Sequence, residues 1–116
     1  MKIQIHEPKI VPDGKHIGVI TAVEYRKEPF EYTDIIIGFK ENEIDYSVKC
    51  GFPTMVTPIS KLGKLLTKFG EKLKIGDEVD PDVLIGLQCQ FVTITETTNK
   101  GKFAKVVQES IHPVDM

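Results

Sequence analysis

A single short segment of this chain has the residue pattern of an amphipathic α-helix, and its position restricts the folds that are available. Within residues 60–70, four apolar side chains recur at the i, i+3, i+4 and i+7 spacing that places them on one helix face: Leu62, Leu65, Leu66 and Phe69. Ser60 is suited to cap the first turn, and Gly70 is suited to the left-handed residue that follows the last turn. All other regular patterns are typical of strands, three before the helix and two after it. The expected fold is therefore a sheet into which one helix is inserted after the third strand.

Alternating apolar and polar residues, rich in β-branched side chains, predict these five strands. They cover residues 16–27, 30–40, 43–52, 86–98 and 102–112. The second and third are joined by residues 41–42, and the fourth and fifth by residues 99–101. Connections this short exclude a parallel crossover and predict antiparallel hairpins. Gly18 inside the first strand predicts a bulge or sharp bend, which a strand needs when it serves two halves of a small barrel.

The side-chain phase divides the second and third strands into an inner and an outer face. The more apolar phase of each strand is placed inward: Thr33, Ile35, Ile37 and Phe39 in the second, and Ile44, Tyr46, Val48, Cys50 and Phe52 in the third. The outer face then carries a mixed set of side chains: Tyr32, Asp34, Ile36, Asp45, Ser47 and Lys49. One side of this hairpin is therefore expected to be buried and the other exposed.

Three antiparallel strands, a helix and two more strands follow one another in the order of an OB-fold, an all-β, five-stranded Greek-key barrel. In that fold, the helix between strands three and four plugs one open end of the barrel with its apolar face. An SH3-like barrel is the nearest alternative, but it normally lacks this helix, and an α+β sandwich is the third. A length of 116 residues fits a single domain. Residues 1–12 are expected to form an irregular or extra-strand N-terminal arm.

Composition and charge exclude several classes of protein. The net charge of -2 argues against a protein that holds nucleic acid by bulk electrostatics, although it leaves room for a local basic patch. No apolar run approaches the roughly 20 residues of a membrane helix, and the N-terminus has no signal-peptide pattern, so a cytoplasmic protein is expected. Cys50 and Cys89 lie in separate strands without CxxC spacing. Two buried thiols in a reducing compartment are expected, with a disulfide as the alternative.

No arrangement of residues predicts catalysis or cofactor binding. The histidines are scattered, and no metal-binding spacing of His and Cys is present. The carboxylates of residues 77–82 do not have the spacing of a calcium loop and predict a solvated loop. A phosphate-binding glycine motif is also absent, since Gly63 lies inside the helix rather than in a turn. The chain is expected to be a non-enzyme without metal or cofactor.

Four segments carry a resemblance to a known group of proteins. They are PDGKHIGVI at residues 12–20, SKLGKLL at 60–66, DVLIG at 82–86 and TTNKGK at 97–102. Together they resemble small OB-fold proteins of phage and prophage replication or recombination clusters. The resemblance runs from about residue 12 to residue 113 and implies a single-stranded-DNA-binding role.

An OB-fold binds single-stranded nucleic acid on strands two and three and on the loops that join strands 1–2 and 4–5. Aromatic side chains stack on the bases, and cations follow the backbone. These criteria select eight residues: Arg26, Lys27, Phe30, Tyr32, Lys49, Lys100, Lys102 and Phe103. Because Asp34 and Asp45 share the outer face and repel phosphate, the expected affinity is modest. The helix lysines and those just after them form either a solvated face or a second path for the strand: Lys61, Lys64, Lys68, Lys72 and Lys74.

Two hypotheses follow. The first is a non-enzymatic protein of replication or recombination that binds single-stranded DNA, with RNA as a further ligand and a homodimer as a further state. The second is an OB-fold protein-interaction module without nucleic-acid binding. Its supporting feature is Ile36, which on an exposed sheet face suits a protein interface better than a phosphate path.

Overall fold

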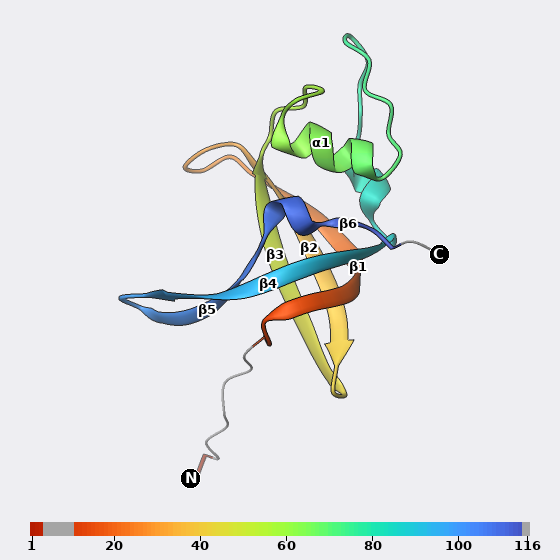
Figure 1. The fold of residues 1–116 in the computed structure, drawn as a ribbon. Coiled ribbons are helices and arrows are strands. Elements are labelled where there is room, and N and C mark those ends of the chain that lie inside the picture. Colours follow the sequence, from red (N-terminus) through yellow and green to blue (C-terminus); the bar gives the residue numbers. More distant parts are fainter. Residues whose placement is uncertain (4–10, 115–116) are drawn as a thin grey trace.

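The computed structural model describes residues 1–3 and 11–114 and consists mainly of β-strands (Figure 1). These residues contain six strands: β1 (Gly14–Arg26), β2 (Tyr32–Glu41), β3 (Ile44–Pro53), β4 (Gln88–Thr98), β5 (Gly101–Val106) and β6 (His112–Pro113). An α-helix, α1 (Lys61–Lys68), lies between β3 and β4. The predicted all-β class and the place of the helix are confirmed. Most of the N-terminal arm expected at residues 1–12 lies outside the described residues.

The strands form one antiparallel sheet in the order β3-β2-β1-β4-β5, with β6 added to β4. β1 connects the two halves, because Gly14–Val19 pairs with β4 and Val19–Arg26 pairs with β2. In the described part of the chain no hydrogen-bonded ladder joins β3 to β5, so the sheet is not closed. The two outermost long strands therefore face each other across a gap.

The irregularity of β1 lies between Ile20 and Ala22, so the prediction of a bulge at Gly18 was wrong in position. Gly18 serves a different purpose. A Cβ atom built on it would lie 2.6 Å from the Gly38 carbonyl oxygen, closer than atoms can approach. Glycine at this position lets β1 pass directly against β2 where the two strands begin to diverge.

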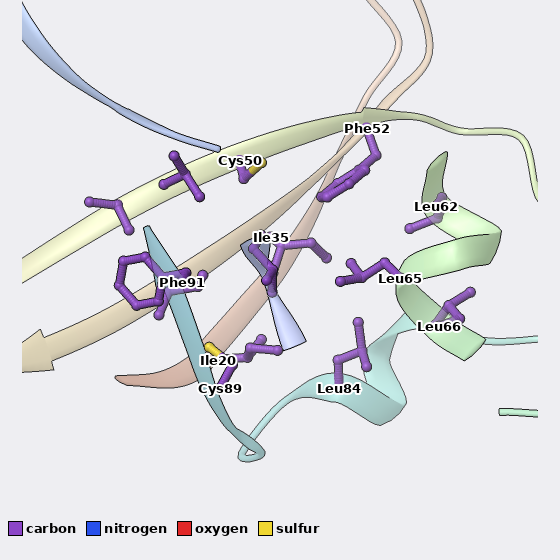
Figure 2. Packing of buried hydrophobic residues seen from close by; sticks show 14 of the residues in the cluster. Ile20, Ile35, Cys50, Phe52, Leu62, Leu65, Leu66, Leu84, Cys89 and Phe91 are labelled. Carbon is purple, nitrogen blue, oxygen red and sulfur yellow. The ribbon is translucent and has the colours of Figure 1, made fainter. Parts of the chain in front are cut away.

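The helix begins and ends as its sequence predicts. The Ser60 hydroxyl oxygen accepts a hydrogen bond from the Gly63 N–H at 3.0 Å, and Gly70 has a positive φ of 94° just after the last turn. Leu62, Leu65 and Leu66 are at most 2% exposed. Figure 2 shows Leu65 pointing from α1 into the sheet toward Ile35, as expected for a helix that covers one end of the core.

The last predicted strand is shorter than expected. β5 ends at Val106, a 3₁₀ turn follows at Gln108–Ser110, and β6 resumes the pairing with β4. The Val92 N–H, which a continuous strand would engage through its backbone, donates instead to the Ser110 hydroxyl oxygen at 2.8 Å. A side chain thus replaces the backbone acceptor, and the chain turns away from β4.

Both cysteines are free and buried, Cys50 on β3 and Cys89 on β4. Burial raises the pKa of Cys50 to about 12 and the pKa of Cys89 to about 11. Both therefore remain protonated in the folded protein at neutral pH, and the thiolate is the reactive form.

We expect the native protein to react slowly with a thiol reagent below about pH 9, and the urea-unfolded protein to react at once. Above that pH the unfolded thiols ionise while the folded ones do not, so folding stability should fall with rising pH. The slope is at most about 1.4 kcal/mol per pH unit for each thiol. The measurement is denaturation against pH, with Cys50→Ala/Cys89→Ala as the control that lacks this component. Fast labelling of the native protein would contradict the burial.

Candidate functional site

The β1–β2 loop and the β4–β5 hairpin carry most of the residues that the sequence predicts for nucleic-acid binding, and both project from the left side of the sheet in Figure 1. Lys27 and Phe30 are exposed in the first loop, and Lys100 is exposed in the hairpin turn. Lys102 and Phe103 lie on β5, and Phe103 is 48% exposed rather than part of the core. An exposed phenylalanine of this kind is available to stack on a base.

The gap between β3 and β5 is a groove of about 700 Å³ that brings two of the predicted residues together. Lys49 contributes from β3 and Phe103 from β5. Three further side chains that suit a nucleic-acid path line the same groove: Lys61, Ile94 and Lys105. Cations and apolar side chains thus line the same depression, which is the combination that single-stranded nucleic acid requires.

This groove continues along α1. A second hollow of about 170 Å³ shares Lys61, Gln108 and Glu109 with the first and adds Lys64 and Lys68. We call the two together the β3–β5 groove. Its cations are five lysines and its carboxylates are two: Lys49, Lys61, Lys64, Lys68 and Lys105 against Glu96 and Glu109. The groove is therefore a local basic region in a protein whose total charge is -2.

Two lysines of the groove form only long ion pairs, whereas Lys68 donates hydrogen bonds to the backbone carbonyl oxygens of Glu109 and Ile111 at 2.8 and 3.4 Å. The Lys105 ammonium group is 3.7 Å from Glu96, and that of Lys49 is 3.8 Å from Glu24. All four side chains are at least 43% exposed. Exposed ion pairs of this length contribute little to stability, so a phosphate group can replace the carboxylate at little cost.

Sequence reasoning omitted Lys105 and treated the helix lysines as a separate face. The sequence could have predicted Lys105, because this residue lies two positions after Phe103 and hence on the same side of β5. The approach of α1 to β5 could not be predicted in this way, since it depends on how distant segments pack. Lys100 and Lys102 do not line the groove.

Asp34 corrects the predicted outer face. It was expected to be exposed and to repel phosphate, yet it is fully buried and paired with Arg26, whose Nε and Nη2 donate to its carboxylate at 2.5 and 2.9 Å. Asp34 is buried because of its neighbour on β3. It pairs with Gly51, a residue without a side chain. The Arg26 and Tyr32 side chains occupy the space above that glycine. The charge of Asp34 is therefore compensated inside the protein.

Ile36 was also expected to be exposed, and it is half-buried. Its backbone lies between Ala22 on β1 and Lys49 on β3, in the middle of the sheet. The feature that supported a protein interface on this face is thus weaker than predicted. Asp45 is exposed, as expected.

His16 is a buried residue to which the sequence assigned no role. Its ring packs between Phe39 and Phe91, with centroid distances of 4.7 and 5.4 Å. Nε2 lies 2.8 Å from both the Pro12 carbonyl oxygen and the Thr93 hydroxyl oxygen. The other nitrogen, Nδ1, is 3.1 Å from Glu41 Oε2, within ion-pair distance but outside hydrogen-bond geometry. The cluster joins β1, β2 and β4 where the sheet divides.

Neither a protein-family model nor a curated protein matches this chain. Among the described residues no group of three or more His, Cys, Asp or Glu side chains is placed to hold a metal ion. Within the same residues, the helix is too short to span a membrane. The resemblance to phage OB-fold proteins therefore remains a prediction.

Proposed function

We propose that this protein is an OB-fold that binds single-stranded DNA without catalysis, in replication or recombination. The order of elements and the sheet order β3-β2-β1-β4-β5 support the OB-fold assignment. In a closed OB barrel the gap between β3 and β5 would be the final seam. Here that seam is the β3–β5 groove.

The observation that carries the proposal is the composition of this groove. Five lysines line a path from β5 to α1, and Phe103 and Ile94 provide apolar surface at its β5 end. A base that stacks on Phe103 contributes roughly 1–3 kcal/mol, and each lysine that meets a phosphate releases counterions. The exposed hairpin and loop residues, among them Lys27 and Phe30, extend the path beyond the groove.

The direct test is fluorescence anisotropy with a labelled oligo-dT of about 30 nucleotides. This length exceeds the site size of one OB-fold, which is about 4–16 nucleotides. We expect binding that prefers the single strand over duplex and weakens strongly between about 50 and 200 mM salt. An RNA oligonucleotide of the same length compares the two nucleic acids. Absence of binding at the lower salt would exclude the proposal.

A second candidate function is a protein-interaction module, and exposed apolar side chains support it. Ile59 and Ile75 are 81% and 96% exposed on the two loops that project above α1 in Figure 1. A hollow of about 660 Å³ between these loops is lined by Val56, Leu73 and Ile75 among others. Apolar side chains gathered this way suit a second copy of the chain or another protein. Sedimentation of the purified protein distinguishes a homodimer from a monomer.

A further inference from the structure

Among the ion pairs of the described residues, the Arg26–Asp34 pair has the most deeply buried carboxylate. The Asp34 side chain is 0% exposed, whereas 46% of the Arg26 side chain remains exposed. The carboxylate accepts hydrogen bonds from Nε and Nη2 of the guanidinium group. Such a two-point contact fixes the plane of the guanidinium group as well as its position.

The same guanidinium group lies over Tyr32. Its central carbon is 5.2 Å from the centre of the ring, within the range of a cation–π interaction. The third nitrogen, Nη1, has no hydrogen bond to another described residue. Arg26 thus retains donors for a ligand, although two of its nitrogens are bound to Asp34.

Gly51 connects this arrangement to the groove. A Cβ atom built on Gly51 would lie 2.9 Å from Asp34 Oδ1 and 3.3 Å from Arg26 Nη2, so these side chains cover the glycine directly. The Gly51 carbonyl oxygen accepts a hydrogen bond from Gln108 Nε2 at 2.5 Å. Gln108 lines both hollows of the β3–β5 groove. The Arg26–Asp34 pair is therefore next to the groove, with Gly51 of β3 between the pair and Gln108.

We propose that Asp34 is a positioning residue that holds Arg26 over Tyr32, so that the Nη1 group of Arg26 binds a phosphate of the strand as it leaves the groove. This inference rests on the proposed function. A guanidinium group that is already fixed loses less conformational entropy when it binds than a free arginine in a loop. Gly51 is what leaves room for the arrangement.

The test is the Asp34→Asn variant, for which the change in charge and the loss of Arg26 positioning predict opposite changes in DNA affinity. Asp34→Asn removes one negative charge, so general electrostatics predicts tighter binding of oligo-dT. Loss of positioning predicts weaker binding, by about tenfold, and a salt slope reduced by about 0.7, which corresponds to one single-strand phosphate contact. Asp77→Asn, in the exposed loop after α1, makes the same charge change and should leave binding unchanged or slightly tighter.

Arg26→Lys is the second variant, because Asp34→Asn could impair folding. It keeps the charge and the intact Asp34, but lysine cannot make the two-point contact, so the same loss of affinity and slope is expected. Circular dichroism identifies the temperature range in which each variant is folded. A variant that is merely less stable would lower the active fraction without changing the salt slope.

The outcomes separate the two proposals. If the unmodified protein does not bind oligo-dT, the proposed function itself is wrong. If it binds, and folded Asp34→Asn binds as tightly or more tightly, only the positioning role is overturned. Should Asp34→Asn fail to fold, unchanged affinity and salt slope in Arg26→Lys would overturn it, and a loss of both would support it.

Discussion

The Gly63→Ala variant is expected to be less stable than the unmodified protein, although alanine favours an ordinary helix over glycine by about 1 kcal/mol. Gly63 lies in the first turn of α1, facing the chain that leads into the helix. A Cβ atom built there would lie 1.8 Å from the Thr57 carbonyl oxygen and 2.9 Å from the Ser60 hydroxyl oxygen. Both atoms belong to the cap, since the Ser60 hydroxyl accepts from Gly63 and donates to Thr57 at 3.1 Å. The methyl group cannot be accommodated unless the cap is broken.

We expect a net loss of about 1–3 kcal/mol or more, the range of overpacked sites, measured as the free energy of unfolding in urea. The matched control is Lys64→Ala, one residue further along α1 and exposed, for which a change within about 0.5 kcal/mol is expected. A Gly63→Ala protein as stable as the unmodified one would show that α1 does not pack on its cap as described. The packing of the helix end would then need to be revised.

The largest effect on binding is expected for the lysines that line the groove from β3 and from β5. Lys49→Gln/Lys105→Gln should weaken oligo-dT binding and reduce the salt slope by about 1.4, since each phosphate contact on a single strand contributes about 0.7. Phe103→Ala should weaken binding without changing the slope, because the stacking that it removes, roughly 1–3 kcal/mol, does not depend on counterions. Anisotropy titrations at several salt concentrations measure both quantities.

The control for this experiment removes two lysine charges that lie outside the β3–β5 groove. Lys15 and Lys40 line a different hollow, beside His16, and do not line the β3–β5 groove. Lys15→Gln/Lys40→Gln should therefore leave the affinity close to that of the unmodified protein. If both double variants lose affinity equally, total charge rather than the groove determines binding.

Local patterns in the sequence were sufficient for most of the secondary structure. The leucine spacing of α1, its Ser60 cap and the short connections of the two hairpins each depend on neighbours in the chain, and all are found. The connections themselves are residues 42–43 and 99–100 rather than the predicted 41–42 and 99–101. The β5 prediction was wrong because its end depends on Ser110, a side chain that replaces a backbone acceptor. A pattern of apolar residues contains no information about which side chain will take the place of a backbone hydrogen-bond acceptor.

The site could be predicted only in part, for a similar reason. The criteria of exposed aromatic and basic residues found Lys49 and Phe103, which line the groove. They could not show that Asp34 would be buried, because that depends on a glycine in the next strand and on an arginine eight residues away. The groove itself is formed by β3, β5 and α1, whose approach is a property of the tertiary structure.

The most direct test of the β3–β5 groove as the binding path is a ¹H–¹⁵N NMR titration of the labelled protein with oligo-dT of about 12 nucleotides, within the site size of one OB-fold. The account predicts that the largest chemical-shift changes fall on β3, on β5 and on the first turns of α1, with Lys49, Lys61 and Phe103 among them. Shifts confined to the loops that carry Ile59 and Ile75, or no shifts at low salt, would contradict it.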